Sequence, residues 1–167
     1  MTAASLLLGL AAAVAQGMTG DWVLTVDGLG PVRIGMTQAQ VAQALGTKLE
    51  GEAIESDDIC VEKASPRLKG VYFMFEERKL TRISIGDDSR VRTPRGIGVG
   101  ASAAEVRRKY PKPLQAEPHH YLDLPGEYLT YWTVPKRRGV RFETDLKRRV
   151  QTIHAGGPSI QYVEGCA

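Results

Sequence analysis

An internal repeat constrains the fold of this 167-residue chain more than any other feature of its sequence. Residues 32–45 align with residues 97–110 at a shift of 65 positions. A chain with such self-similarity is expected to contain two copies of one supersecondary unit. The matched or chemically similar pairs are Val32 and Ile97, Ile34 and Val99, Gly35 and Gly100, Thr37 and Ser102, Gln40 and Glu105, and Val41 and Val106.

The similarity resumes further along both halves of the chain. The two additional matched blocks are residues 70–73 with residues 139–142 and residues 80–83 with residues 150–153. Between the copies, residues 87–95 are polar and contain Pro94, which is typical of a linker. We therefore predict a first α/β repeat over residues 20–90 and a second α/β repeat over residues 91–167.

Each copy carries the signals of a short helix followed by a β-hairpin. Thr37 and Ser102 are each followed three residues later by Gln or Glu, which is the pattern of a capping box at a helix N-terminus. Alternating apolar residues on both sides of a charged turn then predict two antiparallel strands in each copy. Two more strands are expected at residues 22–26 and 129–134. The predicted fold class is α+β, with two tandem helix-plus-antiparallel-hairpin repeats that form a helix layer on one antiparallel sheet.

The beginning of the chain predicts export. Residues 5–14 form an apolar run of the length found in signal peptides, and Ala13-Val14-Ala15 supplies small residues before a cleavage point at Gln16. No Lys or Arg precedes the run, so a buried N-terminal helix is the alternative. The run is too short to span a bilayer. We expect a signal peptide at residues 1–15 and a periplasmic or secreted protein without a transmembrane span.

The chain contains two cysteines, Cys60 and Cys166. An even number of cysteines in an exported protein favours a disulfide. Closing a loop of roughly 105 residues would stabilise the fold by about 4–5 kcal/mol through the lower entropy of the unfolded chain. Two buried free thiols are the alternative. A metal site is not expected, because two isolated cysteines and three histidines show no paired ligand spacing.

The helix openings resemble those of a known group of domains. Gly35-Met36-Thr37, followed by Gln40-Val41 and Leu45-Gly46, resembles the helix opening of β-lactamase-inhibitor-protein-like domains and of the SmpA/OmlA family of small outer-membrane lipoproteins. The segment around Cys60 and the ending at Cys166 also resemble a group of bacterial exported proteins. The resemblance implies a helix layer on a sheet whose free face docks partners, and it implies no enzyme. The chain lacks the lipid-attachment cysteine of the lipoproteins.

The sheet face opposite the helices is the predicted binding site. In one strand Val71 and Phe73 point toward the core, so that Tyr72 and Met74 point the other way. Aromatic, Met and Arg side chains are enriched at the centres of interfaces. We expect a non-catalytic, inhibitor-like or envelope-associated protein that docks an envelope or secreted protein on this open face, with a plain solvated face as the alternative. The predicted partner-binding residues are Tyr72, Met74, Arg82, Tyr131 (or Trp132, since the parity of that strand is open), Arg141 and His154.

Positive charge is concentrated in the second half of the chain. Residues 1–90 hold 9 Lys and Arg against 12 Asp and Glu, whereas residues 91–167 hold 13 against 7. A basic surface attracts anionic polymers, anionic lipid or nucleic acid, unless it is simply a set of solvated turns. The runs Lys136-Arg137-Arg138 and Lys147-Arg148-Arg149 contain no aromatic residue, and an exported protein seldom meets DNA. Anionic cell-wall polymer or lipid, and not nucleic acid, is therefore the alternative partner.

Motifs for catalysis are weak throughout the sequence. The glycines of residues 96–100 precede a helix, but a dinucleotide-binding loop needs a glycine where Ala101 stands. Adjacent histidines such as His119 and His120 point opposite ways on an extended chain, which is poor geometry for one metal ion. A nucleophilic Cys–His pair using Cys60 would need a free thiol. We expect no enzymatic activity and no cofactor, and a small enzyme without a recognisable motif is the alternative.

Overall fold

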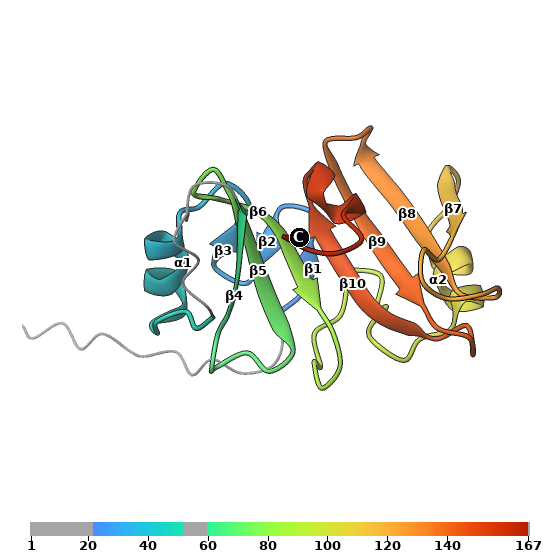
Figure 1. Cartoon of the computed structure of the whole chain (residues 1–167), viewed down its shortest axis with the longest axis horizontal. Helices are drawn as coiled ribbons and strands as arrows, with labels where there is room; N and C mark the ends of the chain where they lie inside the picture. Colours follow the sequence, from blue (N-terminus) through green and yellow to red (C-terminus); the bar gives the residue numbers. More distant parts are fainter. Residues whose placement is uncertain (1–21, 52–59, 167) are drawn as a thin grey trace, which may run out of the picture.

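The computed structural model describes residues 22–51 and 60–166 (Figure 1). The predicted signal peptide at residues 1–15 lies outside the described residues. The described chain contains two α-helices, a three-stranded sheet and a seven-stranded sheet. All pairs of named strands are antiparallel. The predicted α+β class, with helices and antiparallel sheet, is confirmed at this level.

The elements follow one another in two similar series. The first comprises β1 (Leu24–Thr25), β2 (Gly28–Leu29), β3 (Val32–Arg33), α1 (Gln38–Leu45), β4 (Cys60–Ala64), β5 (Val71–Glu76) and β6 (Lys79–Ile85). The second comprises α2 (Ala103–Lys109), β7 (Leu114–Pro118), β8 (Glu127–Val134), β9 (Arg138–Thr144), β10 (Val150–Gly156) and the 3₁₀-helix η1 (Pro158–Gln161). The large sheet has the strand order β4-β5-β6-β10-β9-β8-β7, so one continuous layer includes both halves of the chain (Figure 1).

Both predicted helix starts are confirmed. Thr37 accepts a hydrogen bond from the Gln40 N–H, and the Gln40 side chain accepts one from the Thr37 N–H, which completes a capping box. Ser102 likewise accepts from the Glu105 N–H at the start of α2. Helix α1 ends at Gly46, whose φ of 62° lies in the left-handed region that glycine adopts without a steric penalty.

The apolar core lies between one face of the seven-stranded sheet and a layer formed by the helices and β1–β3. Val41 and Leu45 of α1 and Val106 of α2 belong to the same buried cluster, so both helices cover the same face. The sheet contributes alternate residues to this cluster, as the pleat requires. These residues are Val61, Val71, Phe73, Phe75, Leu80, Ile83, Ile85, Leu129, Val140, Phe142, Val150, Ile153 and Ala155.

The two halves of the sheet meet at the antiparallel pair β6–β10. Ser84 lies directly opposite His154, with Ile85 opposite Ile153 and Ile83 opposite Ala155 on the core side. The strands correspond in pairs on the two sides of this junction, with β5 and β9 next to it and β4 and β8 outside them, and β7 is an additional edge strand of the second half. Ser84 and His154 lie at the centre of the face opposite the helices.

Each half also joins its helix opening to its last strand with the same pair of backbone hydrogen bonds. In the first half the Gly35 N–H donates to the Leu80 carbonyl at 2.7 Å, and the Leu80 N–H donates to the Met36 carbonyl at 2.8 Å. In the second half the N–H of Gly100 donates to the Val150 carbonyl at 2.8 Å, and the Val150 N–H donates to the Ala101 carbonyl at 2.9 Å.

Candidate functional site

The sheet face opposite the helices is covered, contrary to the prediction of an open face. The side chains of Met74, Arg82, Arg141 and His154 point to this face as the strand parity requires, but they are 0, 3, 3 and 7% exposed. Tyr72, at 47%, is exposed. The prediction that these four buried residues form an open docking surface is therefore wrong.

Tyr131 lies on the opposite face from the other predicted site residues. Its Cα is paired with that of Val140, a core residue, and its ring packs edge-on against Tyr110 at 5.3 Å between centroids. Trp132, the alternative left open by the sequence, therefore takes the side of Arg141. Tyr131 belongs to the helix–sheet packing and is removed from the candidate site.

The covering segment is the C-terminal end of the chain itself, residues 157–166, which we call the strap. Its 3₁₀-helix η1 contacts β6, β9 and β10, and the strap then runs to β4, the edge strand at the other side of the first hairpin. The Cys60–Cys166 disulfide fixes its far end to β4, as predicted. In Figure 1 the strap is the red segment that crosses in front of the sheet after β10.

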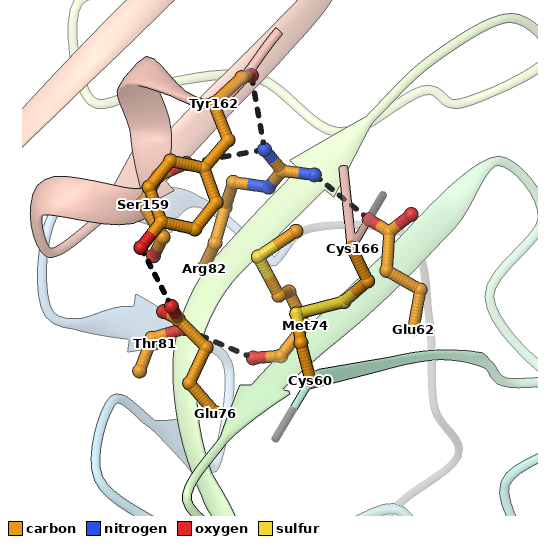
Figure 2. Close-up of a disulfide and its surroundings, with 9 residues drawn as sticks. All are labelled: Cys60, Glu62, Met74, Glu76, Thr81, Arg82, Ser159, Tyr162 and Cys166. Atoms are coloured by element: carbon orange, nitrogen blue, oxygen red, sulfur yellow. Dashed lines mark hydrogen bonds and ion pairs between the residues drawn. A yellow bond between two sulfur atoms is a disulfide. The ribbon is translucent and has the colours of Figure 1, made fainter. Parts of the chain in front are cut away.

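Arg82 holds the strap from below (Figure 2). One terminal nitrogen of its guanidinium donates to the carbonyl oxygens of Ser159 at 3.1 Å and Tyr162 at 3.4 Å. The other forms an ion pair of 2.9 Å with Glu62 on β4. Because a buried guanidinium stays charged, these carbonyls and this carboxylate replace the hydration that its two terminal nitrogens lose, whereas Nε is buried without a hydrogen-bond partner. Arg82 thus links β6, β4 and the strap.

Arg141 plays the same part on the other side of the centre. Its guanidinium donates to the Gln161 carbonyl at 3.0 Å and lies 3.8 Å from the centroid of the Tyr128 ring. Burial lowers the pKa of Arg141, while the carboxylates of Glu143 and Glu117 oppose this effect. The two buried arginines therefore bind the strap through its backbone carbonyls, and their charges are not available to a partner on this face.

A buried hydrogen-bonded chain of Ser84, His154 and Glu143 lies at the centre of the same face. The Ser84 hydroxyl is 2.7 Å from His154 Nδ1, and His154 Nε2 is 3.1 Å from a carboxylate oxygen of Glu143. Burial lowers the pKa of His154, so the ring is neutral at neutral pH. Burial is the largest single effect on Glu143 and raises its pKa, but the hydrogen bond to His154 and the neighbouring charges of the histidines and Arg141 together hold the pKa of Glu143 below its usual value.

The three hydrogen-bonded residues have the composition of a catalytic triad, but their surroundings differ from those of an active site. With an ionised Glu143 accepting from Nε2–H, the neutral ring accepts the Ser84 hydroxyl proton at Nδ1. A nucleophile must also reach a substrate carbonyl beside donors that stabilise an oxyanion. Ser84 is 4% exposed and lies near the end of strand β6, with its hydroxyl already bound to His154. We interpret these three residues as a hydrogen-bonded polar link across the β6–β10 junction.

An open groove of about 570 Å³ lies on the outer side of the strap. It runs from the disulfide to the segment between β7 and β8, where His120 and Tyr121 line it. Three apolar or aromatic side chains project into solvent along it: Tyr121 is 57% exposed, Tyr162 is 44% and Val163 is 38%. This strap groove is the surface that replaces the predicted open sheet face.

The strap groove is acidic in character. Glu76 and Glu164 line it, and no Lys or Arg is among its described lining residues, although the whole chain has a net charge of +3. The Tyr162 hydroxyl donates to the Glu76 carboxylate at 2.8 Å, and this hydrogen bond raises the pKa of Tyr162 (Figure 2). The tyrosine ring is therefore held in place at the edge of the groove, with its face toward solvent left for contacts.

Within residues 22–51 and 60–166, no group of three or more His, Cys, Asp or Glu side chains is arranged to hold a metal ion. The helices of these ranges include none that is both long enough and apolar enough to cross a bilayer.

Comparison with family models, with curated proteins and with solved structures found no match to this chain. The site therefore rests on its own geometry. Sequence reasoning missed the strap residues Tyr162 and Val163 as candidates. A signal for them was present, because a Cys60–Cys166 disulfide requires the C-terminal segment to reach the strand that contains Cys60.

Proposed function

We propose that this chain is a non-catalytic binding protein that docks a segment of a partner protein in the strap groove. The observation that carries the proposal is the row of exposed side chains Tyr121, Tyr162 and Val163 beside a concave surface. Exposed aromatic residues with little conformational freedom are the residues that most often dominate binding energy at protein interfaces. Tyr162 is such a residue, since its hydroxyl is bound to Glu76.

The charge of the groove indicates the chemistry of the partner. Glu76 and Glu164 offer carboxylates at the edge of an apolar surface. Such a surface favours an extended segment that places Lys or Arg beside an apolar side chain. The disulfide and Arg82 fix the strap on the sheet, so the groove is formed before the partner arrives and little ordering is required on binding.

The test is selection of displayed random peptides on the immobilised full-length protein, with its disulfide intact. We expect the enriched peptides to combine a Lys or Arg with an aromatic or aliphatic residue. In Tyr162→Ala the affinity of a selected peptide should fall by about 2 kcal/mol, roughly 30-fold, as for an interface hot spot. Glu164→Gln should weaken binding in low salt more than in high salt.

Tyr72→Ala is the matched control for these variants. Tyr72 is an exposed tyrosine on β5 that does not line the strap groove. Its removal should leave peptide affinity within about twofold, as expected for a residue outside the interface. If no common sequence is enriched, or if Tyr72→Ala is as harmful as Tyr162→Ala, the groove is not the docking site.

We also propose that the protein is exported to the periplasm or secreted. The Cys60–Cys166 disulfide supports this location, because such bonds persist in oxidising compartments. The apolar run at residues 5–14 supports it from the sequence. An inhibitor-like or envelope-associated role follows from the resemblance of the helix openings and is part of the same proposal.

The two halves of the chain are, in our proposal, copies of one helix-plus-hairpin unit. The paired backbone hydrogen bonds support this, because they join residues 35 and 36 to residue 80 and the aligned residues 100 and 101 to residue 150. The β6–β10 pairing supports it as well. Ser84 aligns with His154 in sequence and also lies opposite it in the sheet, as expected for residues on a pseudo-twofold axis between two copies.

A further inference from the structure

Two leucines project from one end of the molecule. Leu124 is 77% exposed and Leu146 is 55% exposed, the highest values among the exposed leucines and valines of the described chain. Leu124 lies in the segment between β7 and β8, and Leu146 lies in the turn between β9 and β10. Both segments lie near α2 at the end of the sheet that is farthest from α1 (Figure 1).

Basic side chains surround these leucines. A groove of about 530 Å³ at this end is lined by four cations and one anion, together with Leu124 and Pro125. The four cations are Arg107, Lys147, Arg148 and Arg149, and the anion is Glu127. Glu127 is engaged by Arg107 in an ion pair. Within the part of the chain that the structure describes, neither Lys147 nor Arg148 has an ion-pair partner, and both are exposed.

The turn between β9 and β10 is held in a fixed shape. One carboxylate oxygen of Asp145 accepts hydrogen bonds from the Lys147 and Arg149 N–H groups, each at 2.8 Å. Arg148 adopts a φ of 58°, which completes the tight turn. Asp145 therefore binds the backbone of the turn, while the side chains of Leu146, Lys147 and Arg148 are exposed.

The neighbouring segment is ordered by His119. Its Nδ1 accepts hydrogen bonds from the Tyr121 and Leu122 N–H groups at 3.1 and 3.2 Å, and its ring stacks on Tyr128. The exposed Asp123 in this segment reduces the local positive charge, so the cations that matter come from the turn and from α2.

We propose that this end of the molecule is a docking surface for an anionic lipid bilayer. A surface that combines projecting leucines with lysine and arginine matches the boundary between headgroups and acyl chains. The cations would lie against anionic headgroups, each contributing to attraction near the membrane surface. Leu124 and Leu146 would enter the apolar boundary, where their burial gains free energy that an acidic protein or soluble polymer provides less readily. The strap groove is not involved, so this proposal and the proposed function stand independently.

The test is co-sedimentation of the full chain with vesicles of phosphatidylcholine, with and without phosphatidylglycerol. We expect association with the mixed vesicles alone. Lys147→Glu with Arg148→Glu should lower the partition coefficient at least tenfold, in line with about fivefold or more for each cation lost. Leu124→Ser with Leu146→Ser should lower it about tenfold without a change of charge.

The matched control is Lys136→Glu with Arg137→Glu, the same charge change in the exposed turn between β8 and β9. It should leave the partition coefficient within about twofold, because that turn lies at the other end of the strands. A Lys147→Gln and Arg148→Gln variant separates lost attraction from new repulsion, and a denaturation midpoint for each variant establishes that it is folded.

Three results would overturn the proposal. The first is failure of the unaltered chain to bind the mixed vesicles at low salt. The second is an equal loss of binding in the control variant, changed at residues 136 and 137, and in the variant changed at residues 147 and 148. In the third result the leucine variant would bind as well as the unaltered chain while the charge variant does not. That pattern would identify a site for soluble polyanions, which binding of poly-glutamate in the absence of lipid would establish.

Discussion

His154 has both ring nitrogens engaged in the interior, and this makes stability depend on pH. In the unfolded chain the ring titrates near its ordinary pKa of 6.5, whereas burial lowers the pKa of His154 in the folded protein. Below pH 6.5 the unfolded state therefore binds a proton that the folded state does not. The free energy of unfolding should fall as the pH drops from 6.5 toward the lowered value, by at most about 1.4 kcal/mol per pH unit for this one proton.

Urea denaturation at several pH values tests this prediction. The contribution of His154 should be complete above pH 6.5 and should be lost on acidification, and His154→Gln should flatten the curve in that window. His120→Gln, which changes an exposed histidine, is the control and should leave the slope unchanged. Glu143 adds a second loss at lower pH, because its lowered pKa means that its contribution is present above 4.5 and disappears below that. Equal slopes for His154→Gln and the unaltered chain would contradict the assignment.

For single residues, the sequence predicted toward which face of the sheet the side chains point, but not what covers that face. Strand alternation correctly placed Met74, Arg82, Arg141 and His154 on the face opposite the helices. The strap, which contacts Arg82 and Arg141, has no periodic pattern of its own in the sequence. Tyr131 was misplaced because a strand with apolar and aromatic residues at adjacent positions has no clear parity.

Among the elements, the strap depends most on one covalent bond. Replacing Cys60 and Cys166 with serine removes the link between the strap and β4 and leaves the hydrogen bonds of Arg82 and Arg141 to hold it. We expect the free energy of unfolding to fall by about 2–5 kcal/mol, because the unfolded chain gains the entropy of an open loop.

Amide hydrogen exchange distinguishes this local effect from a global one. The N–H groups of Ile160 and Tyr162, which bond to Gly157 and Ser159 carbonyls, should exchange faster in the double serine variant. The N–H of Val41 in α1 is the internal control and should lose no more protection than the global loss of stability explains. Unchanged exchange at Ile160 and Tyr162 would show that the arginines alone are sufficient to hold the strap.

The elements that the sequence predicted are those with a local signature. The helix starts at Thr37 and Ser102 depend on contacts within three residues, and the hairpin β5–β6 depends on alternation on both sides of a turn. β4 and β7 were not predicted. β7 is a short edge strand whose residues are mostly exposed, so it lacks the apolar alternation that marks a strand with one buried face. β1 is shorter than the predicted strand at residues 22–26, because only two residues pair with β2.

In the whole molecule, the junction between β6 and β10 determines how the proposed repeats behave. If residues 20–90 and 91–167 were independent units, each would need its own core. Instead one buried cluster contains Leu45 of α1, Val106 of α2 and residues of all the central strands, and the Cys60–Cys166 disulfide joins the two halves again. The geometry therefore predicts one cooperative unit built from two similar halves.

The two tryptophans test this prediction, because each reports on one half of the chain. Trp22 packs against the core beside β1–β3, and Trp132 lies on β8. In the Trp132→Phe variant the fluorescence of the remaining Trp22 should follow urea unfolding of the first half. In the Trp22→Phe variant the fluorescence of the remaining Trp132 should follow unfolding of the second half. Each variant should give a fluorescence transition that coincides with its own transition by circular dichroism, since a continuous sheet and a shared core leave neither half stable alone. The same experiment with the Cys60→Ser and Cys166→Ser changes shows whether the non-covalent junction is sufficient. Separate midpoints for the two reporters would instead show that each repeat folds as its own domain. The pairing of Ser84 with His154 would then only join two independently folded domains.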